Sequence, residues 1–138
     1  METMKLLLDT NIIVDILSGR DGCADSLKVL KYCETKHALG YVSAITVTDV
    51  MYILRKHISP DMVRDALLTM LLIVDVVDVL SSDIRRAFSC GIKDFEDAVQ
   101  AMCANRICAD YIVTRNLKDF HGSPVLSVSP LDVLEILK

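Results

Sequence analysis

The chain has 138 residues, 52% of them hydrophobic and 25% charged, which is typical of one globular domain. Its net charge of −4 argues against a broad basic surface for nucleic acid, although a local basic rim would not show in that total. The apolar runs are too short to cross a bilayer, and no signal pattern precedes the first predicted strand. The five cysteines lack the spacing of metal ligands. We therefore expect a single cytoplasmic domain over residues 1–138, with no membrane segment.

Apolar segments of two kinds alternate along the chain. Short runs rich in Leu, Val or Ile predict strands, and apolar residues repeated every three or four positions predict helices. Strands are expected at 5–8, 41–44, 73–80, 111–114 and 124–128. Helices are expected to start near residues 12, 23, 46 or 48, 59, 81 or 82, 94 and 130. Strands that alternate with one or two helices predict an α/β fold, with a central parallel sheet of four to five strands flanked by helices.

Individual residues mark several of these boundaries. Gly40 is expected to end the second helical unit. Ser59 followed by Pro60 has the pattern of a helix start, with a capping side chain and a proline in the first turn. In the helix that Asp94 opens, the spacing predicts that Phe95 faces the core.

Acidic residues recur where predicted strands and helices meet. Asp9 follows the first strand, Asp49 is expected in the first helical turn after the second, Asp97 lies in the helix before the fourth, and Asp119 follows the fourth. Because parallel strands bring their carboxyl ends to one edge, these acids are expected to converge there. A hard divalent cation with oxygen ligands relieves the repulsion within such a cluster. The pattern therefore favours a site for Mg²⁺ or Mn²⁺.

Each acid also has a simpler interpretation. Asp9 can cap the following helix, Asp49 is favoured by the helix dipole, and Asp94 is more readily a cap than a ligand. Of the neighbouring acids, Asp97 is expected to point into the site and Glu96 to point elsewhere. The acids outside the main junctions are interpreted as solvated or capping groups: Asp15, Asp61, Asp65, Asp75, Asp78 and Asp83.

Four segments together resemble the PIN-domain ribonucleases, in particular the VapC-like toxins of prokaryotic toxin–antitoxin pairs. These segments are residues 7–11, 42–49, 93–101 and 112–120, so the resemblance runs nearly end to end. It implies a single PIN-like domain, a small antitoxin as partner, and a carboxylate site formed by Asp9, Asp49, Asp97 and Asp119. The chain departs from the family pattern at Asp49, where glutamate is usual, so this carboxylate lies roughly 1.5 Å nearer its backbone.

The primary hypothesis is a metal-dependent endoribonuclease in which these four acids hold Mg²⁺ or Mn²⁺ and a metal-activated water hydrolyses the RNA phosphodiester bond. Polar side chains expected to orient the acids or touch the phosphate are Asn11, Ser43, Asp94, Thr114 and Asn116. Candidates for contact with the RNA backbone are Lys93, Arg115 and Lys118.

Two other functions compete with this hypothesis. In the first alternative, the shorter side chain of Asp49 abolishes metal binding. The domain then binds RNA or a partner protein and does not cleave RNA. A phosphatase with Asp9 as nucleophile is less favoured, because the usual second acid two residues later is Asn11 here. The apolar excess also leaves room for a homodimer interface at the helices around residues 51–72.

Overall fold

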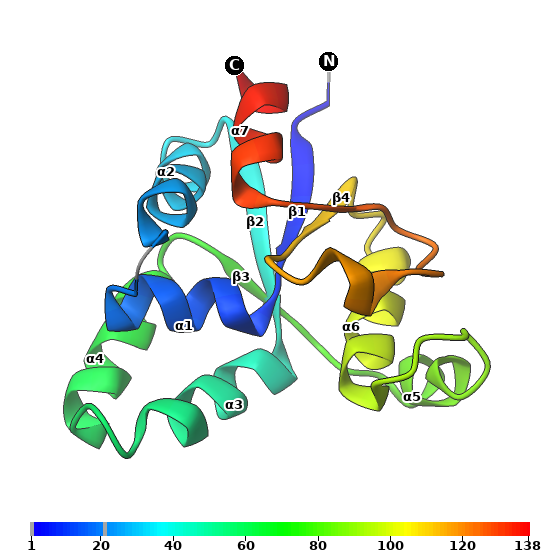
Figure 1. Cartoon of the computed structure of the whole chain (residues 1–138), viewed down its shortest axis with the longest axis horizontal. Helices are drawn as coiled ribbons and strands as arrows, with labels where there is room; N and C mark the ends of the chain where they lie inside the picture. The colour runs from blue at the N-terminus through cyan, green and yellow to red at the C-terminus, as the bar shows by residue number, and fades with distance from the viewer. Residues whose placement is uncertain (1, 21) are drawn as a thin grey trace.

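The computed structural model describes residues 2–20 and 22–138 and contains a five-stranded parallel sheet between two layers of helices (Figure 1). The strands are β1 (Met4–Leu8), β2 (Ala38–Ser43), β3 (Asp75–Val77), β4 (Tyr111–Val113) and β5 (Ser127–Val128). They lie in the order β3-β2-β1-β4-β5, and every neighbouring pair is parallel. The predicted α/β fold with a central parallel sheet is confirmed. Because β1 is the middle strand, the residue that follows it lies at the centre of the carboxyl edge.

Helices cover both faces of the sheet (Figure 1). One face carries α1 (Thr10–Ser18), α2 (Cys23–Glu34), α3 (Ala44–Leu54), α4 (Pro60–Met70) and α7 (Pro130–Leu137). The opposite face carries α5 (Ser81–Ala87) and α6 (Phe95–Arg106), and a short 3₁₀ helix, η1 (Leu117–Phe120), follows β4. Within residues 2–20 and 22–138, every helix is too short or too polar for a membrane span.

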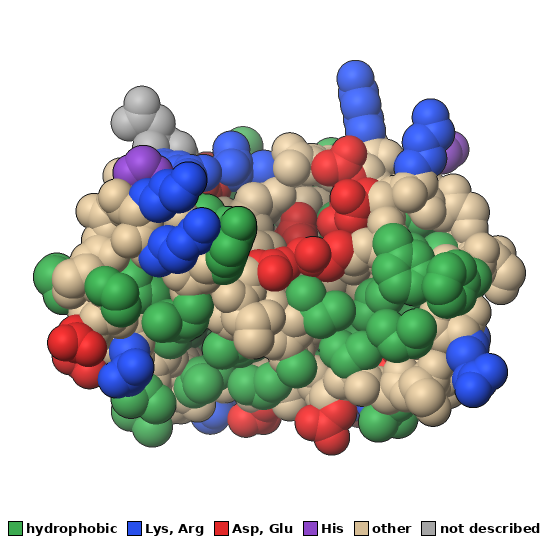
Figure 2. Space-filling view, turned by 90° about the horizontal axis from the view of Figure 1, so that it is seen from below, with side chains coloured by type: hydrophobic (Ala, Val, Ile, Leu, Met, Phe, Trp, Pro, Cys, Tyr) green, Lys and Arg blue, Asp and Glu red, His purple; other side chains and the backbone are tan. Residues whose placement is uncertain are grey.

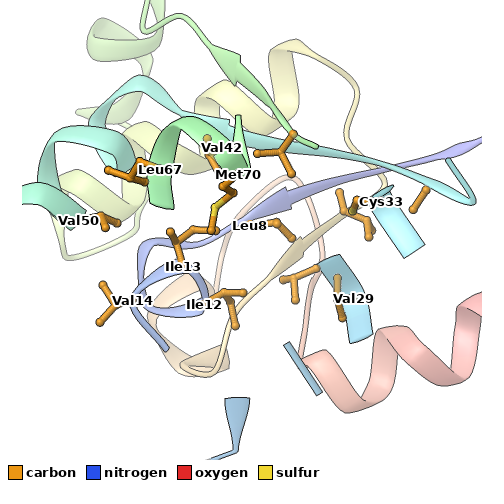
Figure 3. Close-up of a cluster of buried hydrophobic side chains, with 14 of the residues drawn as sticks. Leu8, Ile12, Ile13, Val14, Val29, Cys33, Val42, Val50, Leu67 and Met70 are labelled. Carbon is orange, nitrogen blue, oxygen red and sulfur yellow. The ribbon is translucent and has the colours of Figure 1, made fainter. Parts of the chain in front are cut away.

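The side chains of β1 alternate between two hydrophobic cores. Leu6 and Leu8 belong to the larger core, and Leu7 belongs to the core under α5 and α6. Figure 3 shows Leu8 among side chains from the helices of the larger core. All three leucines are fully buried, and burial of a leucine stabilises a fold by about 1.5–3 kcal/mol. The uniformly apolar sequence of β1 is thus explained by burial on both faces.

Gly40 lies inside β2, so the prediction that it ends a helical unit is wrong. The helix before it, α2, already ends at Glu34. A Cβ atom at Gly40 would come within 2.8 Å of both Cys33 Sγ and Val74 Cγ1. The glycine therefore permits close packing of α2 and the Val74 segment against the sheet.

The predicted start of α3 and the predicted extent of the third strand need correction. The helix α3 begins at Ala44, earlier than predicted, because the Ser43 Oγ atom accepts a hydrogen bond from the Thr46 backbone N–H at 3.3 Å. Asp49 therefore lies in the second helical turn and not in the first. The third strand is short and lies at the edge of the sheet, where only β2 pairs with it.

Phe95 does not face the core, because it is the first residue of α6 and its side chain is 41% exposed. The helical period predicted its direction wrongly, since a first-turn residue need not continue the buried stripe of the later turns. The start of α4 is as predicted, with the Ser59 Oγ atom accepting a hydrogen bond from the Met62 N–H at 3.2 Å.

Candidate active site

Asp9 follows β1 and is held by three hydrogen bonds. Its Oδ1 atom accepts from the Thr10 backbone N–H at 2.8 Å and from Gln100 Nε2 at 2.9 Å. Its Oδ2 atom accepts from Thr114 Oγ1 at 2.8 Å. Asp9 is only 5% exposed, and burial raises the pKa of its carboxyl above the usual value. The three hydrogen bonds lower that pKa and the Asp119 carboxylate raises it further. Asp9 also caps α1, so a role as helix cap is compatible with a role in the acidic site.

A cleft of about 210 Å³ opens beside Asp9 and brings three further acids to it, Glu96, Asp97 and Asp119. Figure 2 shows acidic side chains around a hollow in the middle of this face. The polar residues that complete the lining are Thr10, Asn11, Arg20, Gln100 and Asn116. Three of the four acids assigned from the sequence therefore share one cleft.

Asp97 lies in the first turn of α6 and is positioned by Asp94. The Asp94 Oδ1 atom accepts a hydrogen bond from the Asp97 backbone N–H at 3.0 Å, so Asp94 is the helix cap. Burial raises the pKa of Asp97 to about 7, and the carboxylates of Asp9, Asp94 and Asp119 contribute by repulsion. A cation in the cleft would relieve this repulsion.

Asp49 does not line the cleft of Asp9, but it reaches the site through Glu96. The side chains of Glu96 and Asp49 lie within hydrogen-bonding reach of each other. This contact raises the pKa of Glu96 to about 8, together with burial and with repulsion from Asp49, Asp94 and Asp97. The expectation that Glu96 points elsewhere is therefore wrong.

The supporting hydroxyl groups and amides fall into two groups around Asp9. Thr114 contacts it directly and is itself held by the Asn116 backbone N–H, which donates to Thr114 Oγ1 at 3.0 Å. Ser43 is fully buried and lies 3.4 Å from Thr46 Oγ1, which in turn lies 2.9 Å from Thr10 Oγ1. Ser43 thus supports the site indirectly.

Asn11 ties the start of α1 to the loop after β4. Its Oδ1 atom accepts a hydrogen bond from the Arg115 backbone N–H at 3.5 Å. The side chain of Arg115 turns to Asp15, whose Oδ2 atom contacts Arg115 Nε, and Arg20 Nη1 lies 3.8 Å from Asp15 Oδ1. Asp15 is only 1% exposed, so its interpretation as a solvated or capping group is wrong.

The two lysines expected to contact RNA lie together. Lys93 and Lys118 line a second cleft of about 720 Å³, which also includes His121. This cleft shares Asp119 with the cleft beside Asp9, so the two are contiguous. The second cleft also includes Asp94, so it carries lysines and aspartates side by side next to the acidic site.

Asp83 lies away from these clefts and has a structural role. It is fully buried, and its Oδ2 atom accepts a hydrogen bond from the Leu80 backbone N–H at 2.9 Å. Arg106 Nη2 lies 3.0 Å from the same oxygen. The capping part of its interpretation is confirmed, and the solvated part is wrong.

Sequence reasoning missed Gln100, Glu96 and Arg20 as residues of the cleft. Gln100 is fully buried and follows Asp97 by three positions, one helical turn. It is the one amide in the apolar run Ala98–Ala104, and a lone amide on the buried side of a helix signals a polar partner inside. No comparable signal exists for Arg20.

The acids do not form a ready-made metal group. Among the described residues, no three or more His, Cys, Asp or Glu side chains are arranged to hold an ion. Both oxygens of Asp9 are engaged by neutral donors, which also makes this carboxylate a poor nucleophile and counts against the phosphatase interpretation.

Comparisons with known proteins concern the fold as a whole. A family model described as PIN domain matches residues 5–118. A comparison with the curated proteins finds no match. Among solved structures, VapBC2 from Rickettsia felis bound to a promoter DNA fragment has a TM-score of 0.71 at 20% identity, covering 91% of this chain and 98% of that chain. A toxin–antitoxin complex from Klebsiella pneumoniae has a TM-score of 0.70 at 24% identity, covering 91% and 97%.

A third similar structure is VapC20 from Mycobacterium tuberculosis, a toxin that cleaves the sarcin–ricin loop. Its TM-score is 0.71 at 13% identity, and the match covers 89% of this chain and 98% of that chain. At these identities the structural matches establish the fold.

Proposed function

The chain belongs to the PIN-domain family, and on this premise we propose that it is a metal-dependent endoribonuclease of the toxin type. The observation that carries the proposal is the convergence of Asp9, Glu96, Asp97 and Asp119 on one cleft. We assign Mg²⁺ or Mn²⁺ as the cofactor and RNA as the substrate. VapC20, which has the same fold, cleaves the sarcin–ricin loop.

The residues of the cleft fit a hard divalent cation. Every candidate ligand is an oxygen donor, which Mg²⁺ and Mn²⁺ prefer. The Gln100 Oε1 atom is buried without a hydrogen-bond partner among the described residues and adds an unused oxygen beside Asp9. Burial raises the pKa of Asp97 to about 7, and repulsion from Asp9, Asp94 and Asp119 contributes to the rise; a bound cation would remove that repulsion. We propose Asp9, Asp97 and Asp119 as ligands of the ion. The pair formed by Asp49 and Glu96 completes the set of acids around it.

A bound divalent cation would lower the pKa of a water molecule and offset negative charge on the scissile phosphate. The chain's own residues orient the reactants. Thr10, Gln100 and Thr114 fix both oxygens of Asp9, and this fixation prevents rotation of the carboxylate. Lys93 and Lys118 neutralise the RNA backbone in the adjoining cleft.

Glu96 supplements the short Asp49 side chain. Asp49 is one methylene shorter than the glutamate usual in the family, and Glu96 reaches the cleft that Asp49 does not line. We propose that the pair acts as a unit, with Glu96 carrying negative charge toward the ion and Asp49 holding Glu96 in place.

The proposed protein partner is a small antitoxin. The Rickettsia felis structure contains VapBC2, and the Klebsiella pneumoniae structure is a toxin–antitoxin complex. Such a partner would act with the toxin in the cytoplasm. The helices α3 and α4 expose an apolar surface that suits a homodimer contact, formed by Tyr52, Ile53, Met62, Leu68 and Leu72. Light scattering tests the dimer, and a monomeric mass would contradict it.

The nuclease proposal is tested by cleavage of single-stranded RNA with and without Mn²⁺. Asp9→Asn and Asp97→Asn are expected to abolish Mn²⁺-dependent cleavage while leaving the protein folded. Asp65→Asn is the matched control, because Asp65 is an exposed acid on α4 away from the cleft, and it is expected to cleave normally. Undiminished cleavage by Asp9→Asn would overturn the proposal.

The second candidate is an RNA- or protein-binding domain without nuclease activity. Its one supporting observation is the aspartate at position 49, where glutamate is usual in the family. Calorimetry with Mn²⁺ near neutral pH separates the two. Binding that Asp97→Asn weakens supports the nuclease, and the absence of binding supports the non-catalytic domain.

A further inference from the structure

Two exposed aromatic rings form a pair beside the acidic cleft. Phe88 is 77% exposed and Phe95 is 41% exposed, and their ring centroids lie 4.5 Å apart at an interplanar angle of 41°. The only other phenylalanine, Phe120, is buried. Burial of aromatic rings is a major source of core stability, so this exposed pair is not explained by folding.

The pair lies next to the residues of the proposed active site. Phe88 directly follows α5, and Phe95 is the first residue of α6, between the cap Asp94 and the cleft residue Glu96. Figure 2 shows hydrophobic side chains adjoining the acidic hollow on this face. The rings themselves line neither cleft, so they are placed to meet a part of the polymer that extends beyond the acids.

The segment that contains Phe88 is basic, whereas Phe95 is flanked by Asp94 and Glu96 of the acidic cleft. The segment 85–93 holds Arg85, Arg86 and Lys93 and contains no acidic residue, in a chain whose net charge is −4. All three cations are exposed, and none of them forms an ion pair with another described residue. Lys93 also lines the second cleft, together with Lys118 and Asp119. Basic side chains interleaved with exposed rings are the combination that binds single-stranded nucleic acid.

We propose that Phe88 and Phe95 form a stacking site for one unpaired base of the RNA substrate, a few nucleotides from the bond that is cut. The inference rests on the proposed function for its substrate class and adds the requirement that the substrate be unpaired at this base. An aromatic ring stacks on the face of any base, whereas a duplex hides those faces. Arg85 and Lys93 hold the phosphates on either side.

The test is binding of a fluorescent single-stranded oligoribonucleotide in a chelating buffer, where the metal-dependent cleavage cannot proceed, together with a set of oligonucleotides in which each base in turn is removed. For the wild-type protein, removal of one particular base is expected to weaken binding about tenfold, the size of one base–aromatic stack. Phe88→Leu is expected to bind the intact strand about tenfold more weakly and to be indifferent to that base removal. Phe88→Trp restores both the affinity and the sensitivity.

Leu126→Ala provides the control, because Leu126 is an exposed apolar residue just before β5 and outside segment 85–93. It is expected to bind like the wild type. The stacking site is overturned if Phe88→Leu binds the intact strand with wild-type affinity. It is also overturned if the affinity lost through Phe88→Leu adds to the affinity lost through base removal at every position of the strand. It is also overturned if Phe88→Leu changes the mass of the protein in light scattering, which would identify the pair as a protein interface.

The same samples separate this inference from the nuclease proposal. RNA binding that is sensitive to Phe88→Leu, without Mn²⁺-dependent cleavage, supports the stacking site and contradicts the nuclease. Cleavage of single-stranded RNA at equal rates by the wild type and Phe88→Leu, with equal affinity, supports the nuclease and contradicts the stacking site.

Discussion

The side-chain amide of Gln100 donates a hydrogen bond to Asp9 at 2.9 Å, across 91 positions of sequence. This contact joins α6 to the end of β1, so the helix that carries Asp97 is fixed relative to Asp9. The same amide leaves its Oε1 atom buried without a partner among the described residues. Because an unsatisfied buried oxygen is unfavourable, its retention beside four acids indicates a role in the site.

Gln100→Leu should weaken Mn²⁺ binding, because Asp9 loses a donor that fixes its orientation. Loss of an orienting partner typically lowers metal affinity about 10- to 100-fold. Calorimetry measures the affinity, and circular dichroism checks the fold. Asn105→Leu replaces an amide near the other end of α6 and should bind Mn²⁺ normally. Equal affinity of Gln100→Leu and the wild type would contradict the assigned role.

Asp97→Asn should stabilise the metal-free protein at and above neutral pH. The pKa of Asp97 is raised from 3.8 to about 7 by burial and by repulsion from neighbouring carboxylates. Between these values the folded chain holds a proton that the unfolded chain has lost. The free energy of unfolding of the wild type therefore falls as pH rises through this window, and the asparagine variant lacks this fall.

Urea denaturation in a chelating buffer at about pH 5 and about pH 8 measures the difference. The stability advantage of Asp97→Asn over the wild type should be larger at the higher pH. Addition of Mn²⁺ should stabilise the wild type and have little effect on the variant. If the difference in free energy of unfolding between Asp97→Asn and the wild type were the same at both pH values, the raised pKa of Asp97 would not be the cause of that difference.

Glu96→Gln should change the number of protons released when Mn²⁺ binds. The hydrogen bond to Asp49 raises the pKa of Glu96 to about 8, so the pair retains a proton near neutral pH. Metal binding requires ionised carboxylates, and the wild type should therefore release about one proton more than the variant at pH ~7. Titration calorimetry in two buffers with different ionisation enthalpies counts these protons. Equal release by both proteins would exclude Glu96 from the metal site.

Arg115→Met should destabilise the protein more than the double variant Asp15→Asn/Arg115→Met. Asp15 is buried against Arg115, and removal of one partner leaves a buried charge with only Arg20 at 3.8 Å. Breaking a buried pair in this way costs about 3 kcal/mol, whereas removing both charges costs less. Urea denaturation measures both variants.

Arg64→Met is the matched control, since Arg64 pairs with Asp61 on the exposed surface of α4 at 3.9 Å. Exposed pairs contribute little, so its stability should be close to that of the wild type. If the double variant is no more stable than Arg115→Met, the ion pair does not anchor the loop after β4.

The sequence was sufficient to predict the parallel sheet and the convergence of Asp9, Asp97 and Asp119, because each follows from a local pattern combined with one rule of topology. Strand ends in a parallel sheet lie at one edge, so an acid after a strand is placed without knowledge of packing. The helix caps at Asp94 and Ser59 were equally local and were predicted correctly.

Three of the errors concern residues whose environment is set by distant segments. Glu96 was misplaced because the direction of a side chain in the first turn depends on where α6 sits against α3. Asp15 was misplaced because its partner Arg115 is 100 positions away in sequence, and Gly40 because the constraint comes from Cys33 and Val74. None of these contacts has a local signature.

The hydrogen bond between Thr114 and Asp9 spans 105 positions of the chain and follows the pairing of β1 with β4. A ribosome delivers the chain N-terminus first, so Asp9 is synthesised 105 residues before Thr114, and Asp119 follows later still. An incomplete chain that ends before β4 has one edge of β1 unpaired and only part of the carboxylate site. The strand order thus ties completion of the carboxylate site to the synthesis of β4 and the segment that follows it.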